Sequence, residues 1–209
     1  MDGPMDPHLI RDEATLEALY GAPSEPAVMK EVDHVHPHYR AFIEAAPFMA
    51  MATSGPGGMD VSPRGDPPGF VTVQDPKTLL IPDRRGNNRT DSLHNLIHDD
   101  RVALLFLIPG VTETLRVNGR AVISIDPALL ARFPAQGKLP RSVIVVHVES
   151  VYFQCGKAII RSDLWNPDKR IPRSALPTAG TILRDISAGQ VGGEAYDQAY
   201  PQRLRETLY

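Results

Sequence analysis

Residues 81–89 (IPDRRGNNR) hold three arginines and two asparagines between an apolar run and a stretch with helical spacing. Guanidinium groups match phosphate oxygens with paired hydrogen bonds, and the N-terminus of a following helix adds backbone N–H donors and a favourable dipole. This combination suits a phosphate monoester. The alternative is a solvated turn in which the arginines pair with Asp83, Asp91 and other carboxylates.

Residues 62–69 (SPRGDPPG) form a second unusual segment, rich in proline and glycine. Such residues stiffen a backbone, so that its N–H and C=O groups point in fixed directions. A flavin ring needs fixed partners of this kind, because its N5, O4 and O2 atoms accept hydrogen bonds and its N3 donates one. The alternative is an ordinary rigid surface loop.

Two further segments carry isolated polar candidates. In residues 113–119 (ETLRVNG), strand alternation puts Thr114, Arg116 and Asn118 on one face. Arg116 on that face serves either a ligand or a surface ion pair. Residues 154–165 (QCGKAIIRSDLW) hold the only tryptophan, Trp165. It either stacks on a planar cofactor or packs in a core or an interface.

Metal and nucleophile chemistry have little support in the sequence. The three alternating histidines of residues 34–38 are interrupted by Pro37, which favours a polar linker over a metal site. His94 and His98 are one turn apart on a predicted helix, but they lack a third ligand at suitable spacing. Cys155 is the only cysteine, which rules out an intrachain disulfide and a cysteine-cluster zinc site. We therefore assign no metal ligand and no catalytic acid, base or nucleophile.

The composition is that of a soluble globular protein. The 209 residues are 42% hydrophobic, with a formal net charge of −3. These values exclude global disorder and give no basic field for nucleic acid or an anionic membrane. No apolar run approaches the ~20 residues that span a bilayer, and the acidic residues 1–20 are unlike a signal peptide. We expect a cytoplasmic protein with no nucleic-acid or membrane partner.

Short β-prone runs separated by turns dominate the middle of the chain. Six or seven such strands favour a closed antiparallel barrel, because a flat sheet of this length would leave edges to protect. The predicted strands are residues 48–53, 59–62, 70–73, 78–81, 102–108, 113–125 and 142–153. The predicted helices are residues 8–20, 37–46, 90–98, 127–133 and 195–209. Pro23 and Pro26 predict an extended linker after the first helix.

The four polar segments, in their order along the chain, resemble the FMN-binding split-barrel family that includes pyridoxamine 5′-phosphate oxidase, and a bacterial branch of it in particular. The stretches that carry the resemblance are VSPRGDPPGF (61–70), LLIPDRRGNNRTDSL (79–93), ETLRVNGRA (113–121) and QCGKAIIRSDLW (154–165). The resemblance implies a mainly β fold with flanking helices, a six- to seven-stranded antiparallel Greek-key barrel. It also implies a homodimer with two FMN sites at the subunit interface, each built from both chains.

The resemblance assigns residues to that site by position. Those that would border the isoalloxazine ring are Ser62, Pro63, Arg64 and Gly65. Those that would hold the phosphate are Arg84, Asn88 and Arg89, with Arg85 nearby. Those that would face the flavin from a strand are Thr114 and Arg116. Those that would come from the partner chain are Lys157, Arg161 and Trp165. The resemblance covers residues 37–166, so we expect a barrel domain there, an N-terminal helix and linker over residues 1–36, and a C-terminal extension over residues 167–209.

The chain departs from the true oxidases after Trp165, where NPDKRIPR (166–173) stands in place of an Arg-Leu-His-type segment that grips pyridoxal phosphate. The missing histidine and a slightly longer phosphate loop argue against vitamin B6 oxidation. We expect an FMN-dependent oxidoreductase that passes a hydride through flavin N5 to or from an unidentified small molecule. The alternatives are a non-catalytic flavin carrier or sensor, and a split-barrel protein that binds a deazaflavin or heme.

Overall fold

The computed structural model describes residue 6 and residues 8–209. The chain divides into two compact units, Met1–Glu31 and Val32–Tyr209. The first unit holds α1 (Glu13–Tyr20) and α2 (Glu25–Met29). The extended linker predicted from Pro23 and Pro26 is wrong over residues 25–29, because Pro26 lies in the first turn of α2. A proline is tolerated there, since the N–H that it lacks has no intrahelical partner at that position.

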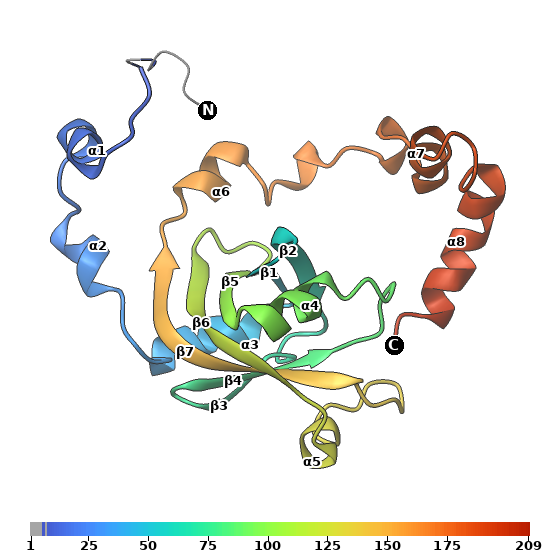
Figure 1. The fold of residues 1–209 in the computed structure, drawn as a ribbon, viewed down its shortest axis with the longest axis horizontal. Helices are drawn as coiled ribbons and strands as arrows, with labels where there is room; N and C mark the ends of the chain where they lie inside the picture. The colour runs from blue at the N-terminus through green and yellow to red at the C-terminus, as the bar shows by residue number, and fades with distance from the viewer. Residues whose placement is uncertain (1–5, 7) are drawn as a thin grey trace. The chain divides into compact units, whose positions relative to one another are not determined.

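Seven antiparallel strands form one sheet in the second unit, in the order β2-β1-β5-β6-β7-β4-β3 (Figure 1). All seven predicted strands are present, with ends that differ by a few residues. Their bounds are β1 (Phe48–Gly55), β2 (Gly58–Gly65), β3 (Thr72–Asp75), β4 (Thr78–Asp83), β5 (Arg101–Leu107), β6 (Thr114–Ser124) and β7 (Ser142–Gln154). The longest strand, β7, pairs with β6 on one side and with β4 on the other, and so joins the two halves of the sheet.

The sheet is open, which corrects the expectation of a closed barrel. Its two end strands, β2 and β3, do not pair with each other in the described part of the chain. Instead α3 (Pro37–Ala45) packs against β3, β6 and β7, and its Ile43 is fully buried. This helix therefore packs on the inner side of the sheet, from β6 and β7 to the end strand β3, and adds Ile43 to the main core. The mainly β class with flanking helices is confirmed.

The core follows from strand alternation. Met49 and Met51 on β1 and Leu104 and Phe106 on β5 are each no more than 1% exposed, and the residues between them are more accessible. Because successive side chains of a strand point to opposite faces, one face of each strand enters the core. The other buried side chains of this core include Leu79, Ile81, Leu115, Val117, Ile144, Val146 and Val151.

The helices of the second unit lie around the sheet. The helix predicted over residues 90–98 is α4 (Asp91–His98), which packs on β1. The helix predicted over residues 127–133 is a single turn, α5 (Pro127–Leu130), and the tail helix is α8 (Glu194–Glu206). Two helices were not predicted, α6 (Lys157–Ser162) and α7 (Ala179–Ile186). Two short 3₁₀ turns, Pro167–Lys169 and Arg173–Ala175, lie between α6 and α7.

Across the described residues, no helix combines the length and the apolar character that a bilayer span requires. The domain boundaries expected after residues 36 and 166 stay predictions.

Candidate functional site

Two adjoining cavities open where β2 and β4 end, and we call them together the arginine cavity. The larger has a volume of about 480 Å³ and the smaller about 170 Å³. Both are lined by Arg64, Asp83, Arg84, Arg85 and Gly86. The larger is also lined by Pro63, Gly65, Asp66, Phe70, Pro82, Leu208 and Tyr209, and the smaller by Asn87, Asn88, Thr90, Leu93, Arg141 and Ser142.

Strand pairing sets the positions of these residues. Arg64 lies opposite Met49 in the β1–β2 pair, and Asp83 lies opposite Ser142 in the β4–β7 pair. The loop predicted over residues 62–69 is wrong over residues 62–65, which belong to β2. Only the following residues form the loop. Pro63 is compatible with this strand, since β2 is at the edge of the sheet and has no neighbour on its outer side.

Positive charge exceeds negative charge in the arginine cavity. Among its lining side chains are four guanidinium groups but only two carboxylates, those of Asp66 and Asp83. The excess of two positive charges matches the charge of about −2 that a phosphate monoester carries near neutral pH. Because guanidinium groups bind phosphate oxygens through paired hydrogen bonds, the lining suits a phosphate.

Arg84 is the most extensively held of these arginines. Its Nε donates to Asp66 Oδ2 at 2.8 Å, and its Nη1 donates to the Phe133 carbonyl at 2.6 Å. Its guanidinium carbon also lies 5.7 Å from the centre of the Tyr209 ring. The Asp66 side chain is only 5% exposed and that of Arg84 is 20% exposed, so this is a largely buried ion pair. Arg84 therefore has a structural role in addition to any role toward a ligand.

Arg64 and Arg85 keep hydrogen-bonding capacity for a ligand. Arg64 Nε is buried without a hydrogen-bond partner among the described residues, and Arg64 Nη2 is 3.8 Å from Asp83 Oδ1. Arg85 is exposed and makes no ion pair or hydrogen bond with the part of the chain that the structure describes. A buried donor without a partner is costly, so Arg64 Nε would gain from any acceptor that reaches it, whether a water molecule or a ligand.

Asp83 gives a test of the electrostatics of the cavity. Burial raises the pKa of the Asp83 carboxyl, and the nearby Arg64 and Arg141 lower it by less. A carboxyl with a raised pKa in the folded state favours folding most at low pH, and this contribution is lost as the pH rises through the folded pKa. The Asp83→Asn side chain cannot ionise. The free energy of unfolding of the variant minus that of wild type should therefore increase from about pH 4 to pH 7.

Urea unfolding of both proteins at each pH measures this difference. A difference that does not increase with pH would show that the arginines offset or outweigh the effect of burial on the pKa of Asp83.

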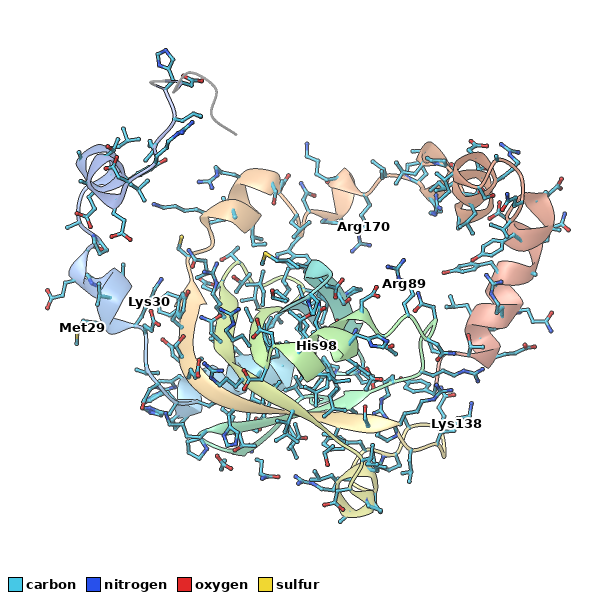
Figure 2. The ribbon with its side chains drawn as sticks, in the orientation of Figure 1. Met29, Lys30, Arg89, His98, Lys138 and Arg170 are labelled. Atoms are coloured by element: carbon cyan, nitrogen blue, oxygen red, sulfur yellow. The ribbon has the colours of Figure 1, made fainter. Side chains whose placement is uncertain are left out.

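The loop between β4 and α4 carries the remaining phosphate candidates (Figure 2). Asn88 Oδ1 accepts a hydrogen bond from Arg141 Nη1 at 3.0 Å, and both residues line the smaller cavity. Arg89 does not line it, because its Nε pairs with Asp91 Oδ2 at 2.8 Å. Ser62 does not line the cavity either, since its hydroxyl donates to Asp60 Oδ2 at 2.8 Å. Arg141 is a site residue that was not predicted, and its only signal in the sequence is its place directly before a predicted strand.

The other five predicted residues lie away from the arginine cavity. Their segments follow or pair with the far end of β7, because Thr114 lies opposite Gln154 and Arg116 opposite Tyr152. Arg116 Nη1 binds the Tyr152 hydroxyl at 3.0 Å, and Trp165 Nε1 donates to the Val111 carbonyl at 2.7 Å. The group consists of Thr114, Arg116, Lys157, Arg161 and Trp165. A strand rises ~3.3 Å per residue, so the 12 steps from Ser142 to Gln154 separate the two ends of β7 by ~40 Å of chain.

The sequence of the chain matches one protein family over more than half of its length. The family is described as pyridoxamine 5′-phosphate oxidase, and the match covers residues 35–155. These residues include α3 and all seven strands. A comparison with curated proteins found no match.

Several solved structures are similar to this one. HupZ from Group A Streptococcus is 17% identical, with a TM-score of 0.48 over 57% of this chain and 94% of that chain. A candidate pyridoxamine 5′-phosphate oxidase from Lactobacillus delbrueckii is 20% identical, with a TM-score of 0.44 over 58% of this chain and 99% of that chain. General stress protein 26 from Bacillus anthracis is 14% identical, with a TM-score of 0.40 over 54% of this chain and 88% of that chain.

Proposed function

This chain belongs to the pyridoxamine 5′-phosphate oxidase family, and from that membership we propose that it is a cytoplasmic flavoprotein that binds FMN in the arginine cavity. The observation that carries the proposal is the buried Arg64 Nε without a partner, in a cavity with an excess of two positive charges. FMN has both a phosphate and a ring with hydrogen-bond acceptors, so it would satisfy both features.

The residues divide between the two ends of FMN. Arg85, Asn88 and Arg141 surround the smaller cavity and would hold the phosphate together with Arg84. Pro63, Arg64 and Gly65 line the larger cavity, at the end of β2, and would border the ring. Arg89 and Ser62 would contribute only after leaving their present partners, Asp91 and Asp60.

The proposed activity is oxidoreduction. A bound flavin supplies hydride chemistry at its N5 atom, and the protein binds, orients and electrostatically tunes it. Arg64 would place its positive charge beside the ring and so favour the anionic reduced state. The remaining titratable groups of the cavity, Asp66, Asp83 and Tyr209, lie around that position. The substrate would be a small molecule that exchanges a hydride with the flavin.

We also propose that the protein acts as a homodimer. The arginine cavity and the Lys157, Arg161 and Trp165 group lie at opposite ends of β7, so one chain does not bring them together. A two-fold axis that passes near the middle of β7, at right angles to the strand, would place one end of β7 in one protomer near the other end in its partner and so unite them. Met59 and Val61, on the edge strand β2, are 83% and 65% exposed, and are available for such an interface.

Binding of FMN and riboflavin to the ligand-free protein tests the proposal. We expect FMN to bind at least about 100-fold more tightly than riboflavin, because riboflavin lacks the phosphate and would lose at least two charge-assisted hydrogen bonds. Isothermal titration measures both affinities, and sedimentation of the FMN complex should give a dimer. Equal affinities, or no FMN binding, would contradict the proposal.

Stopped-flow mixing of the FMN complex with NADH and NADPH then separates an enzyme from a flavin carrier. Saturable reduction of the flavin supports an oxidoreductase, and its absence with both donors favours the carrier.

A further inference from the structure

The C-terminal end of the chain lies against the arginine cavity. The segment from Thr207 to Tyr209 follows α8 and reaches the side of the sheet on which Lys138 lies (Figures 1 and 2). Leu208 and Tyr209 line the larger cavity, together with Arg64 and Arg84. One wall of this cavity is therefore formed by residues that are about 140 positions apart in the sequence, such as Asp66 and Tyr209.

Three contacts hold Tyr209 in this place. Its hydroxyl donates to Asp66 Oδ1 at 2.5 Å, its ring lies 5.7 Å from the Arg84 guanidinium carbon, and its main-chain oxygen accepts from Lys138 Nζ at 2.8 Å. Asp66 and Arg84 are the buried ion pair of the cavity. The aromatic side chain is thus attached to the residues that line the site, and not to a separate core.

A tight turn presents Lys138 to Tyr209. Ala135 and Lys138 exchange two backbone hydrogen bonds of 2.9 Å, and the residues between them, Gln136 and Gly137, have φ angles of 48° and 75°. Two successive residues with positive φ are the mark of a type I′ turn, which is short and well defined. The anchor for the end of the chain is therefore a rigid element, inserted between α5 and β7.

The helix that precedes Tyr209, α8, packs against α7, where Asp197 accepts hydrogen bonds from the Thr178 hydroxyl at 2.5 Å and the Gly180 N–H at 2.8 Å. No residue of α8 is buried, and its tyrosines and Arg203 interact with one another. A segment with few buried apolar contacts opens at low cost compared with the core. The contacts of Tyr209 join the segment that follows α8 to Asp66, Arg84 and Lys138.

Tyr209 closes the cavity without filling it. With Tyr209 in place the larger cavity still has about 480 Å³, which is within the range of about 300–1,000 Å³ typical of small-molecule sites. Tyr209 also lines two neighbouring cavities, one with Lys138 and Arg141 and one with Phe133 and Gln136. Tyr209 and Arg84 are thus shared by the walls of all three cavities.

We propose that Leu208 and Tyr209 form a lid on the arginine cavity, which retains the flavin and shields it from solvent. The lid opens when the Tyr209 hydroxyl leaves Asp66 and the chain end leaves Lys138. The proposal rests on the proposed function, because the ligand that the lid retains is FMN.

The rate at which FMN leaves the protein tests the lid. Tyr209→Ala should release FMN about tenfold faster, the factor that corresponds to one lost hydrogen bond to a charged group. Tyr209→Phe keeps a ring over Arg84 but cannot donate to Asp66, so its release rate should lie between those of Tyr209→Ala and wild type. The matched control is Tyr200→Ala, since Tyr200 lies on α8 and does not line the cavity. Its release rate should equal that of wild type.

Recovery of free-flavin fluorescence after dilution measures each rate, and iodide quenching of the bound flavin measures its exposure. Iodide should quench more strongly in Tyr209→Ala than in wild type. If wild type fails to bind FMN, both the proposed function and the lid are wrong. If wild type binds FMN and Tyr209→Ala releases it no faster, the lid alone is wrong. Tighter binding by Tyr209→Ala would also overturn the lid, because Tyr209 would then be an occupant of the site.

Discussion

Arg84→Ala should lower the stability of the protein and strongly weaken its FMN binding. The change removes the hydrogen bonds to Asp66 and to the Phe133 carbonyl and leaves the Asp66 carboxylate, which is 5% exposed, without its charged partner. Breaking a buried ion pair by removal of one partner costs about 3 kcal/mol or more. The same change removes one of the guanidinium groups proposed to bind the phosphate, so we expect FMN affinity to fall at least about 100-fold.

Urea unfolding in the absence of flavin measures the loss of stability. Titration with FMN, under conditions in which the variant is folded, measures the loss of affinity. The two effects separate in the double variant Arg84→Ala/Asp66→Asn, which removes both charges of the pair. Its stability should recover in part, because no unpaired carboxylate remains buried. Its FMN affinity should not recover. Recovery of both would mean that Arg84 only supports the fold, and wild-type affinity in Arg84→Ala would remove it from the site.

The strands were predictable because their signal is local. Alternation along β1 and β5 and the long apolar run of β7 require only the residues of each strand. The strand–loop–helix order around residues 81–91 was predictable for the same reason, and β4, the loop and α4 occur in this order. The residue types alone predicted the positive charge of this loop. They did not predict which ion-pair or hydrogen-bond partner each arginine has.

Proline was the main source of error at the level of elements. Pro63 lies within β2 and Pro26 within α2, although the sequence pattern predicts irregular chain at both. Proline removes one N–H donor, and this matters only where the donor is needed. The outer side of an edge strand and the first turn of a helix do not need it, and edge position is a property of the whole sheet that a local pattern does not contain.

Long-range contacts explain why some residues of the site were not predicted from the sequence. Asp66 lay inside a recognised segment, but nothing in that segment indicated its pairing with Arg84. Arg141 and Tyr209 reach the cavity from a strand start and from the segment after α8, and Lys138 binds Tyr209 from a tight turn. Their convergence depends on the β4–β7 pairing and on the path of residues 166–209, neither of which one sequence specifies.

Gly119→Ala should destabilise the protein more than the same substitution at the other glycines of the sheet, because its added Cβ atom would make the shortest contact. A Cβ atom at residue 119 would lie 2.0 Å from the carbonyl oxygen of His147 and 3.0 Å from its carbonyl carbon. Both atoms belong to the backbone of β7, so no side-chain rotation relieves the contact. The pairing of β6 with β7 shifts register between Asn118 and Gly119, which is a bulge at the position of close approach.

The loss should be about 3 kcal/mol, the upper part of the range for overpacking, because the two strands that must separate are the longest pair in the sheet. Urea unfolding of the flavin-free protein measures it. Gly57→Ala is the matched control, since a Cβ atom there would meet no atom within 4 Å. Its unfolding free energy should stay within about 0.5 kcal/mol of wild type. Equal stability of the two variants would show that β6 and β7 do not approach as closely at residue 119 as the structure has them, and the path of β7 from the arginine cavity to α6 would need revision.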